Sequence, residues 1–163
     1  MSSTNQLPTR SDIVVIGSGI IGAATAYNLV ASGANVTLVE RGDFCGEASG
    51  ANIGLIPVSS KSLGLLLDLG RRSMEIYATL SETLGRHVHF DQVGAFHVAI
   101  TPESLEKRRE LTRQQQALGM EVYDLTGDEA RAMEPMISPK VLGASFSPTD
   151  GMIYPFSVVA AYL

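Results

Sequence analysis

The chain has 163 residues, of which 45% are hydrophobic and 18% are charged, and its formal net charge is −5. This is an ordinary globular composition, and the acidic balance disfavours nucleic acid, which requires a clustered excess of Lys and Arg. The single cysteine, Cys45, excludes an internal disulfide framework and favours a reducing, cytoplasmic compartment. The chain is long enough for one domain with a real core.

The first eleven residues, MSSTNQLPTRS, are polar. They lack the basic-then-apolar order of a signal peptide, and they predict a loose leader that is at least partly disordered. The stretch from Asp12 to Glu40 that follows holds no charged residue between its ends. A membrane span needs about 20 apolar residues, so a span must be considered. Internal Ser, Thr, Asn and Gly residues, and the lack of a flanking Trp, disfavour it.

The hydrophobic pattern changes character inside this stretch. Residues 13–16 form a run of Ile and Val, which is typical of a buried parallel strand. From Ile20 to Val30 the apolar residues recur at helical spacing, and Gly33 follows as a helix stop. Residues 35–40, NVTLVE, predict a second strand. Together these segments predict a βαβ unit.

The turn between the first strand and the helix reads G-x-G-x-x-G. In this pattern Gly17 permits a tight turn, Gly19 lets the backbone approach a pyrophosphate, and Gly22 lets the helix pack closely on the strand. The helix then presents unpaired N–H groups and a positive dipole end to the phosphates. The alternative is a glycine turn that binds nothing.

An acidic residue, Glu40, ends the second strand about 20 residues further on, where it would accept hydrogen bonds from ribose hydroxyls. An acid at this place disfavours a 2′-phosphate and therefore NADP, but it leaves NAD and FAD open. Arg41 either lies over an adenine edge or is exposed. If the turn binds nothing, Glu40 is a solvated strand end.

The segment after the second strand, RGDFCGEASGANIGLIP, is rich in small residues. A nicotinamide dehydrogenase would instead continue into another crossover helix and a third strand. Small side chains let backbone amides approach a large flat ligand, and Ser49 and Asn52 can bond to phosphate or ring edges. A flexible linker is the alternative.

The order of motifs from Asp12 to Gly54 resembles the FAD-dependent amine and amino-acid oxidoreductases of the D-amino-acid oxidase superfamily, which includes glycine oxidase, sarcosine oxidase and D-amino-acid dehydrogenase branches. The resemblance implies an α/β fold, in which a Rossmann-type FAD-binding βαβ unit precedes the start of an α+β antiparallel substrate domain. Members of this family are longer, so the chain is expected to be an incomplete, N-terminal portion.

The resemblance also implies FAD as the cofactor and assigns residues to its parts. The pyrophosphate would lie at the glycine turn and at a second motif of small residues, the adenosine ribose at Glu40 and Arg41, and the flavin near the end of the second motif. With Gly22 and Asn52, which the spacing itself suggests, the predicted cofactor-binding residues are Gly17, Gly19, Ile20, Ile21, Gly22, Glu40, Arg41, Ala48, Ser49, Asn52, Ile53, Gly54 and Leu55.

The later segments also predict helices and strands, but each of these sequence signals is weak by itself. The first predicted elements are an amphipathic helix over 63–84, a half-buried strand at GAFHVAIT, whose apolar side is Phe96, Val98 and Ile100, and a helix capped by Thr101. A capping box then precedes a short helix. The last segment, LGASFSPTDGMIYPFSVVAAYL, predicts a hairpin-like pair of strands and a helix opened by Pro155.

These elements suggest domain boundaries for the complete enzyme. Residues 12–86 would be the first part of the FAD-binding domain, and residues 87–154 would begin the substrate domain. The helix at 155–163 would lead back to the rest of the FAD-binding domain. The partner of the chain would then be the C-terminal half or a second chain.

The chain shows no catalytic constellation and no metal-ligand spacing. His87, His89 and His97 are expected to be strand or loop residues, and Cys45 to be a small buried residue. The leading hypothesis is the N-terminal part of an enzyme that oxidises the C–N bond of a small amine or amino acid by hydride transfer to FAD, the isolated piece being inactive. The alternatives are an NAD-binding dehydrogenase domain and a non-catalytic nucleotide-binding subunit.

Overall fold

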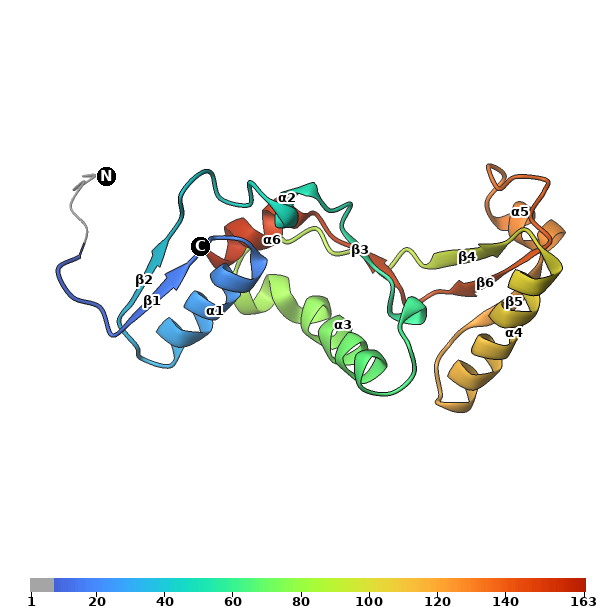
Figure 1. The fold of residues 1–163 in the computed structure, drawn as a ribbon, viewed down its shortest axis with the longest axis horizontal. Helices are drawn as coiled ribbons and strands as arrows, with labels where there is room; N and C mark the ends of the chain where they lie inside the picture. Colours follow the sequence, from blue (N-terminus) through green and yellow to red (C-terminus); the bar gives the residue numbers. More distant parts are fainter. Residues whose placement is uncertain (1–7) are drawn as a thin grey trace. The chain divides into compact units, whose positions relative to one another are not determined.

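The computed structural model describes residues 8–163, so most of the predicted leader lies outside the described residues. The chain forms two compact units (Figure 1). Of the described residues, the first unit contains 8–54 together with Leu80–His89 and Ile153–Leu163, and the second contains Leu55–Thr79 and Phe90–Met152. The predicted domain boundaries of the complete enzyme stay a prediction. Within the described residues, no helix is long and apolar enough to cross a membrane.

The first unit is built on a βαβ motif. Strand β1 (Ile13–Ile16), helix α1 (Ile20–Ala31) and strand β2 (Val36–Val39) follow one another, and the two strands pair in parallel. The uncharged stretch therefore divides into strand, turn, helix and strand, which confirms the predicted βαβ unit. A parallel pair requires a crossover of this kind because its strands run in the same direction.

The core of the first unit lies between α1 and helix α6 (Pro155–Tyr162). Ala23, Cys45 and Val159 are buried together, and Tyr162 packs against them. The other face of the β-sheet carries open apolar side chains, since Val14 is 58% exposed and Ile16 is 85% exposed. Parallel sheets are normally covered on both faces, so this face is suited to burial against further polypeptide.

The second unit is built on a three-stranded antiparallel sheet. Strand β6 (Gly143–Ser147) lies between β4 (Ala95–Ala99) and β5 (Tyr123–Thr126), and α4 (Pro102–Ala117) and α5 (Gly127–Met133) pack on it. A separate two-stranded ladder in this unit joins β3 (Leu55–Ile56) and β7 (Gly151–Met152), and η1 (Val58–Ser60) follows β3. Helix α2 (Ala48–Ala51) belongs to the first unit. Helix α3 (Leu65–Leu84) is divided, with residues 65–79 in the second unit and residues 80–84 in the first.

The predicted hairpin near the end of the chain is wrong. Strand β6 pairs with β4 on one edge and with β5 on the other, while β7 pairs with β3. A strand has only two edges, so β6 has none left for β7. The sequence around Asp150 therefore carries the chain from one sheet to another instead of turning it back on itself.

The predicted buried side of β4 is also wrong. Val98 is 51% exposed and Ile100 is 63% exposed, whereas Ala99 is buried. Helix α4 covers the side of β4 that carries His97 and Ala99. The helix packs closely on this side of the sheet at Gly143, the residue of β6 that pairs with Ala99. A Cβ on Gly143 would lie 2.8 Å from Leu105 Cδ1 of α4.

Helix α4 begins at the predicted cap. The Thr101 side chain accepts a hydrogen bond from the Ser104 N–H at 3.1 Å, and the Ser104 hydroxyl accepts one from the Thr101 N–H. Thr101→Ala is expected to lower the free energy of unfolding by about 1 kcal/mol, because one N–H of the first turn loses its acceptor. Urea denaturation measures this loss. Thr101→Ser should restore most of it, and equal stabilities of all three proteins would contradict the assignment.

Candidate cofactor-binding site

The glycine turn between β1 and α1 is tied to the neighbouring strand. Gly17 adopts φ +99°, a conformation that glycine reaches without steric cost, and its N–H donates to the Val39 carbonyl at 2.8 Å. A Cβ on Gly22 would overlap the carbonyl oxygen of Gly17. The first turn of α1 therefore rests directly on the glycine turn, as the spacing of the motif predicts.

The first turn of α1 holds no acidic residue of its own. Gly19 at the N-cap offers no side chain. The Ile20 N–H donates to the Ser49 hydroxyl at 3.0 Å, and a Cβ on Gly19 would lie 2.9 Å from the same oxygen. The fold thus brings Ser49 of the second motif to the amide end of the helix. The positive dipole end of the helix, with the Ser49 hydroxyl beside it, fits a pyrophosphate.

Glu40 is fixed beside the turn by hydrogen bonds at both carboxylate oxygens. Oε2 accepts from the Ser18 N–H at 2.8 Å and from the Ser18 hydroxyl at 3.1 Å, while Oε1 accepts from the Gly42 N–H at 3.0 Å. These bonds, led by that from the Ser18 backbone, lower the pKa of Glu40 to about 2. An ionised carboxylate has acceptor capacity beyond these three bonds, which fits ribose hydroxyls.

The lowered pKa of Glu40 predicts a pH dependence of stability. A carboxyl whose pKa is depressed on folding stabilises the protein fully above its unfolded value of 4.5, and this contribution is lost as the pH falls toward 2. The melting temperature of the wild type should therefore fall more steeply between these pH values than that of Glu40→Gln. Parallel pH profiles for the two proteins would contradict this role. Glu47→Gln serves as a control, because that exposed carboxylate pairs only with Arg41.

The second motif forms a turn of helix rather than a flexible linker. Residues 48–51 are α2, and a Cβ on Gly50 would overlap the Cys45 carbonyl oxygen. The Asn52 amide donates to the Ser49 carbonyl at 2.5 Å and accepts from the Gly54 N–H at 2.7 Å. Asn52 thus braces its own loop, and any contact with the cofactor stays a prediction.

Cys45 is a structural residue, as expected. Its side chain is 2% exposed and packs with Ala23 and Val159, and burial raises the pKa of its thiol. A raised pKa keeps the thiol protonated and therefore weakly nucleophilic. Within residues 8–163, no group of three or more His, Cys, Asp or Glu side chains is placed to hold a metal ion.

The remaining predicted cofactor-binding residues are exposed at the protein surface. Arg41 forms an exposed ion pair with Glu47 at 2.6 Å. Ile21 is 79% exposed and Ile53 is 75% exposed, so their apolar side chains are open to a ligand or to further polypeptide. Leu55 belongs to the second unit as the first residue of β3, whereas the other predicted residues belong to the first unit.

The sequence reasoning missed Ser18. This residue is 4% exposed and supplies two of the hydrogen bonds that fix Glu40, although it occupies a variable position of the glycine motif. The sequence did contain a signal for these bonds: a residue with a hydroxyl group lies inside the turn, and an acidic residue ends the next strand. The parallel pairing of β1 with β2 brings the two residues together.

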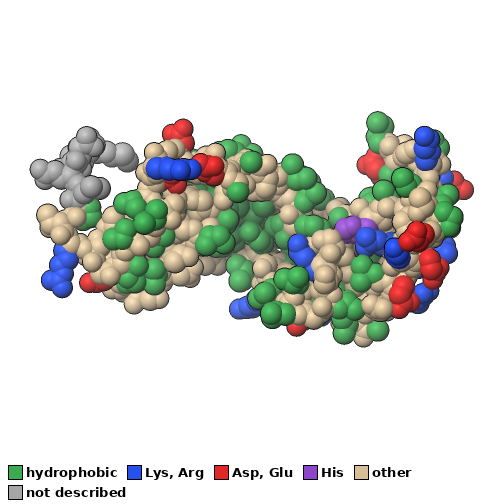
Figure 2. All heavy atoms as spheres, in the orientation of Figure 1, with side chains coloured by type: hydrophobic (Ala, Val, Ile, Leu, Met, Phe, Trp, Pro, Cys, Tyr) green, Lys and Arg blue, Asp and Glu red, His purple; other side chains and the backbone are tan. Residues whose placement is uncertain are grey.

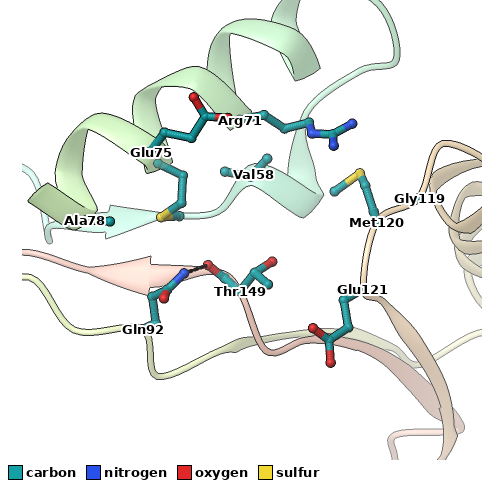
Figure 3. A pocket seen from close by; sticks show the side chains of 10 residues that line it. Val58, Arg71, Glu75, Ala78, Gln92, Gly119, Met120, Glu121 and Thr149 are labelled. Carbon is teal, nitrogen blue, oxygen red and sulfur yellow. Dashed lines mark hydrogen bonds between the residues drawn. The ribbon is translucent and has the colours of Figure 1, made fainter.

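A second concave region lies within the second unit (Figure 3). It holds about 450 Å³ and combines side chains from α3 with residues around Met120 and Thr149. Its charged groups already have partners: Arg71 donates to the Leu118 carbonyl at 3.4 Å, and Glu121 accepts from Tyr123 at 2.7 Å. None of the predicted cofactor residues lines this pocket, so it is not part of the candidate site.

Many charged side chains on the surface pair with side chains of opposite charge. In Figure 2, basic and acidic side chains lie intermingled on the visible face. On α4, Lys107 pairs with Glu103 at 2.7 Å and Arg113 pairs with Glu110 at 2.7 Å. The predicted solvated face is confirmed for Lys107 and Arg109, which are exposed, but it is wrong for Arg108. Arg108 is half-buried, its Nη1 is buried without a hydrogen-bond partner among the described residues, and burial lowers its pKa.

Comparison with known proteins identifies the family. Residues 12–163 match the family model described as DAO, FAD dependent oxidoreductase. The chain is 29% identical over 158 residues to 4-methylaminobutanoate oxidase (formaldehyde-forming) of Paenarthrobacter nicotinovorans, and 32% identical over 154 residues to one subunit of the opine oxidase of Agrobacterium tumefaciens. These matches cover 94% and 87% of this chain, but only 19% and 41% of those proteins.

Solved structures agree with the family match. The glycine oxidase of Geobacillus kaustophilus superposes with a TM-score of 0.88 and 28% identity, covering 94% of this chain and 43% of that chain. The chain therefore spans less than half the length of the relatives it matches. The fold matches the FAD-binding region of the glycine oxidase, which confirms the predicted α/β fold class. The chain belongs to the DAO family of FAD-dependent oxidoreductases.

Proposed function

We propose that this chain is the N-terminal, FAD-binding part of an oxidoreductase that oxidises the C–N bond of a small amine or amino acid. The observation that carries the proposal is the anchored turn, in which Ser49 reaches the amide end of α1 while Ser18 holds the ionised Glu40 beside it. This arrangement supplies donors for a pyrophosphate and an acceptor for a ribose next to each other, which is what a dinucleotide requires.

The residues have separate tasks in this proposal. The amides of Ile21 and Gly22 hold the pyrophosphate. The Ser49 hydroxyl, which accepts from the Ile20 N–H, approaches it from the second motif together with the backbone at Ala48. Glu40 accepts hydrogen bonds from the adenosine ribose. The backbone at Ile53, Gly54 and Leu55 lies near the flavin ring. When FAD is bound, its ring supplies the hydride acceptor, while the protein supplies position and electrostatics.

The names of several relatives support this substrate class, although an anaerobic glycerol-3-phosphate dehydrogenase is also among the relatives. The other names specify glycine, opines and 4-methylaminobutanoate as substrates of those proteins, all of which carry an oxidisable carbon bonded to nitrogen. We extend this class, and no single substrate, to the enzyme that contains this chain. Further partners would be the remaining polypeptide or a second subunit. No residue of the chain is assigned a catalytic role.

The proposal is tested with the protein from the complete reading frame that contains these residues. Anaerobic addition of sarcosine, glycine, a D-amino acid or an opine is expected to bleach the flavin absorbance for at least one of these amines. Glycerol 3-phosphate is the matched control, because it offers a C–O bond to oxidise. Bleaching by glycerol 3-phosphate alone would overturn the substrate class, and retention of NAD without flavin would overturn the proposal.

A further inference from the structure

One buried serine in the second unit is held by residues of β4, of α4 and of the loop before β7. Ser59, in η1, is 0% exposed, and its N–H donates to Asp150 Oδ1 at 3.1 Å. Its hydroxyl contacts both Asp150 Oδ2 and, at 2.8 Å, His97 Nε2. Its carbonyl accepts from Gln115 Nε2 at 2.7 Å. We call Ser59, His97, Gln115 and Asp150 the Ser59 hub.

The direction of each hydrogen bond follows from the number of protons. Ser59 has one hydroxyl proton, and the carboxylate of Asp150 can only accept, so the hydroxyl donates to Asp150. His97 must then donate its Nε2–H to the hydroxyl oxygen. The pKa of His97 is lowered by burial and by the charge of Arg108, and is partly restored by Asp150, so the neutral Nε2–H form is expected at neutral pH. Every polar atom of Ser59 is thus satisfied.

The hub is not a nucleophilic site. In a hydrolytic triad the acid contacts the histidine on the nitrogen remote from the serine, whereas here Asp150 contacts the serine itself. Ser59 is also closed to solvent. Its groups can therefore hold structure but cannot attack a substrate.

The position of the hub in the chain indicates what it holds. Ser59 follows strand β3 by three residues, and Asp150 directly precedes β7, the strand that pairs with β3. That ladder has only two residue pairs, Leu55 with Met152 and Ile56 with Gly151. So short a ladder is only marginally stable by itself. The Ile153 N–H donates to the Gly54 carbonyl beyond one end of the ladder, and the bonds of Asp150 to Ser59 join the two strands beyond the other end.

We infer that Ser59 is a positioning residue for the proposed flavin reaction, because the hub fixes β3 and with it Leu55, the residue predicted to lie near the flavin ring. The inference rests on the proposed function. His97 and Gln115 reach Ser59 from β4 and α4, so they anchor β3 to the three-stranded sheet and its helix. Ser59 and Asp150 thereby connect the flavin-side strand to the antiparallel sheet within the second unit.

The test compares Ser59→Ala with Ser60→Ala in the FAD-loaded protein from the complete reading frame. Ser60 lies in the same turn, is exposed, and bonds only to the Pro57 carbonyl. Ser59→Ala is expected to keep its FAD content but to change the visible circular dichroism of the flavin and to lower kcat about tenfold to a hundredfold, the scale of a misplaced reacting group. Ser60→Ala should match the wild type in all three measurements.

A milder pair of variants covers the case in which Ser59→Ala does not fold. His97→Ala removes the donor to the Ser59 hydroxyl and should change the flavin dichroism in the same direction, while His97→Gln keeps an N–H donor and should restore the wild-type spectrum. Wild-type dichroism and kcat in folded Ser59→Ala, or in His97→Ala if the former does not fold, would overturn the inference alone. Absence of FAD from the wild-type protein would instead overturn the proposed function.

Discussion

Gly22→Ala is expected to lower the affinity for FAD at least about a hundredfold, equivalent to about 2.7 kcal/mol. The new Cβ would overlap the Gly17 carbonyl oxygen and would lie 3.0 Å from the Gly17 carbonyl carbon. Both atoms belong to the backbone of the glycine turn, which cannot rotate away as a flexible side chain can. Helix α1 must therefore move, and its free amides leave the place where the pyrophosphate is expected.

The measurement is equilibrium titration of the apoprotein with FAD, with far-ultraviolet circular dichroism to confirm that the variant is folded. Gly42→Ala is the matched control, because a Cβ there meets no atom within 4 Å. Its N–H remains available to Glu40. Affinity of Gly22→Ala within about threefold of the wild type would show that the glycine turn does not position the cofactor.

Gly54→Ala is expected to have the second largest effect. Gly54 adopts φ +74°, and a Cβ there would overlap the carbonyl oxygen of Ile153, whose N–H donates to the Gly54 carbonyl at 2.8 Å. The left-handed conformation alone costs a non-glycine residue about 1–2 kcal/mol. The overlap with a backbone oxygen adds to this cost, so a total loss of about 3 kcal/mol or more in unfolding free energy is expected.

Gly64→Ala separates the two contributions. Gly64 has φ +90°, but a Cβ there meets no atom within 4 Å, so this variant carries only the conformational cost. Urea denaturation of both variants gives the overlap energy as their difference. Equal losses would mean that the close contact between Gly54 and Ile153 does not constrain the loop.

Local patterns in the sequence were sufficient for the elements that depend on neighbouring residues. The change from β-branched residues to helical spacing predicted β1 and α1, and Thr101 and Thr126 predicted the starts of α4 and α5. These signals work because strand pleat, helical period and capping are set by residues within a few positions of one another.

Features that depend on distant residues could not be predicted in this way. The side of β4 that is buried is decided by α4, and the partner of β7 is decided by β6 having no free edge. The bonds of Ser59 to Asp150, Gln115 and His97 join residues 91, 56 and 38 positions apart. No periodicity carries such information, since it arises only when the elements pack.

Within the candidate site, too, local patterns could be predicted and contacts between distant residues could not. The glycines and Glu40 stood out because their spacing follows a mechanism, and the structure places Ser49 at the helix end as the second motif required. The part played by Ser18 was hidden, because its importance lies in the carboxylate that it reaches across the β1–β2 pair. Roles of individual residues on the cofactor stay predictions.

The most direct test of the central claim is a comparison of FAD, FMN and ADP as ligands of the protein from the complete reading frame. If α1, Ser49 and Glu40 hold the pyrophosphate and the adenosine ribose, FAD should bind at least about a hundredfold more tightly than FMN, which lacks the adenosine half. ADP should then compete with FAD, and Glu40→Ala should weaken both. Equal binding of FAD and FMN, with no competition by ADP, would contradict the claim that this turn is the dinucleotide site.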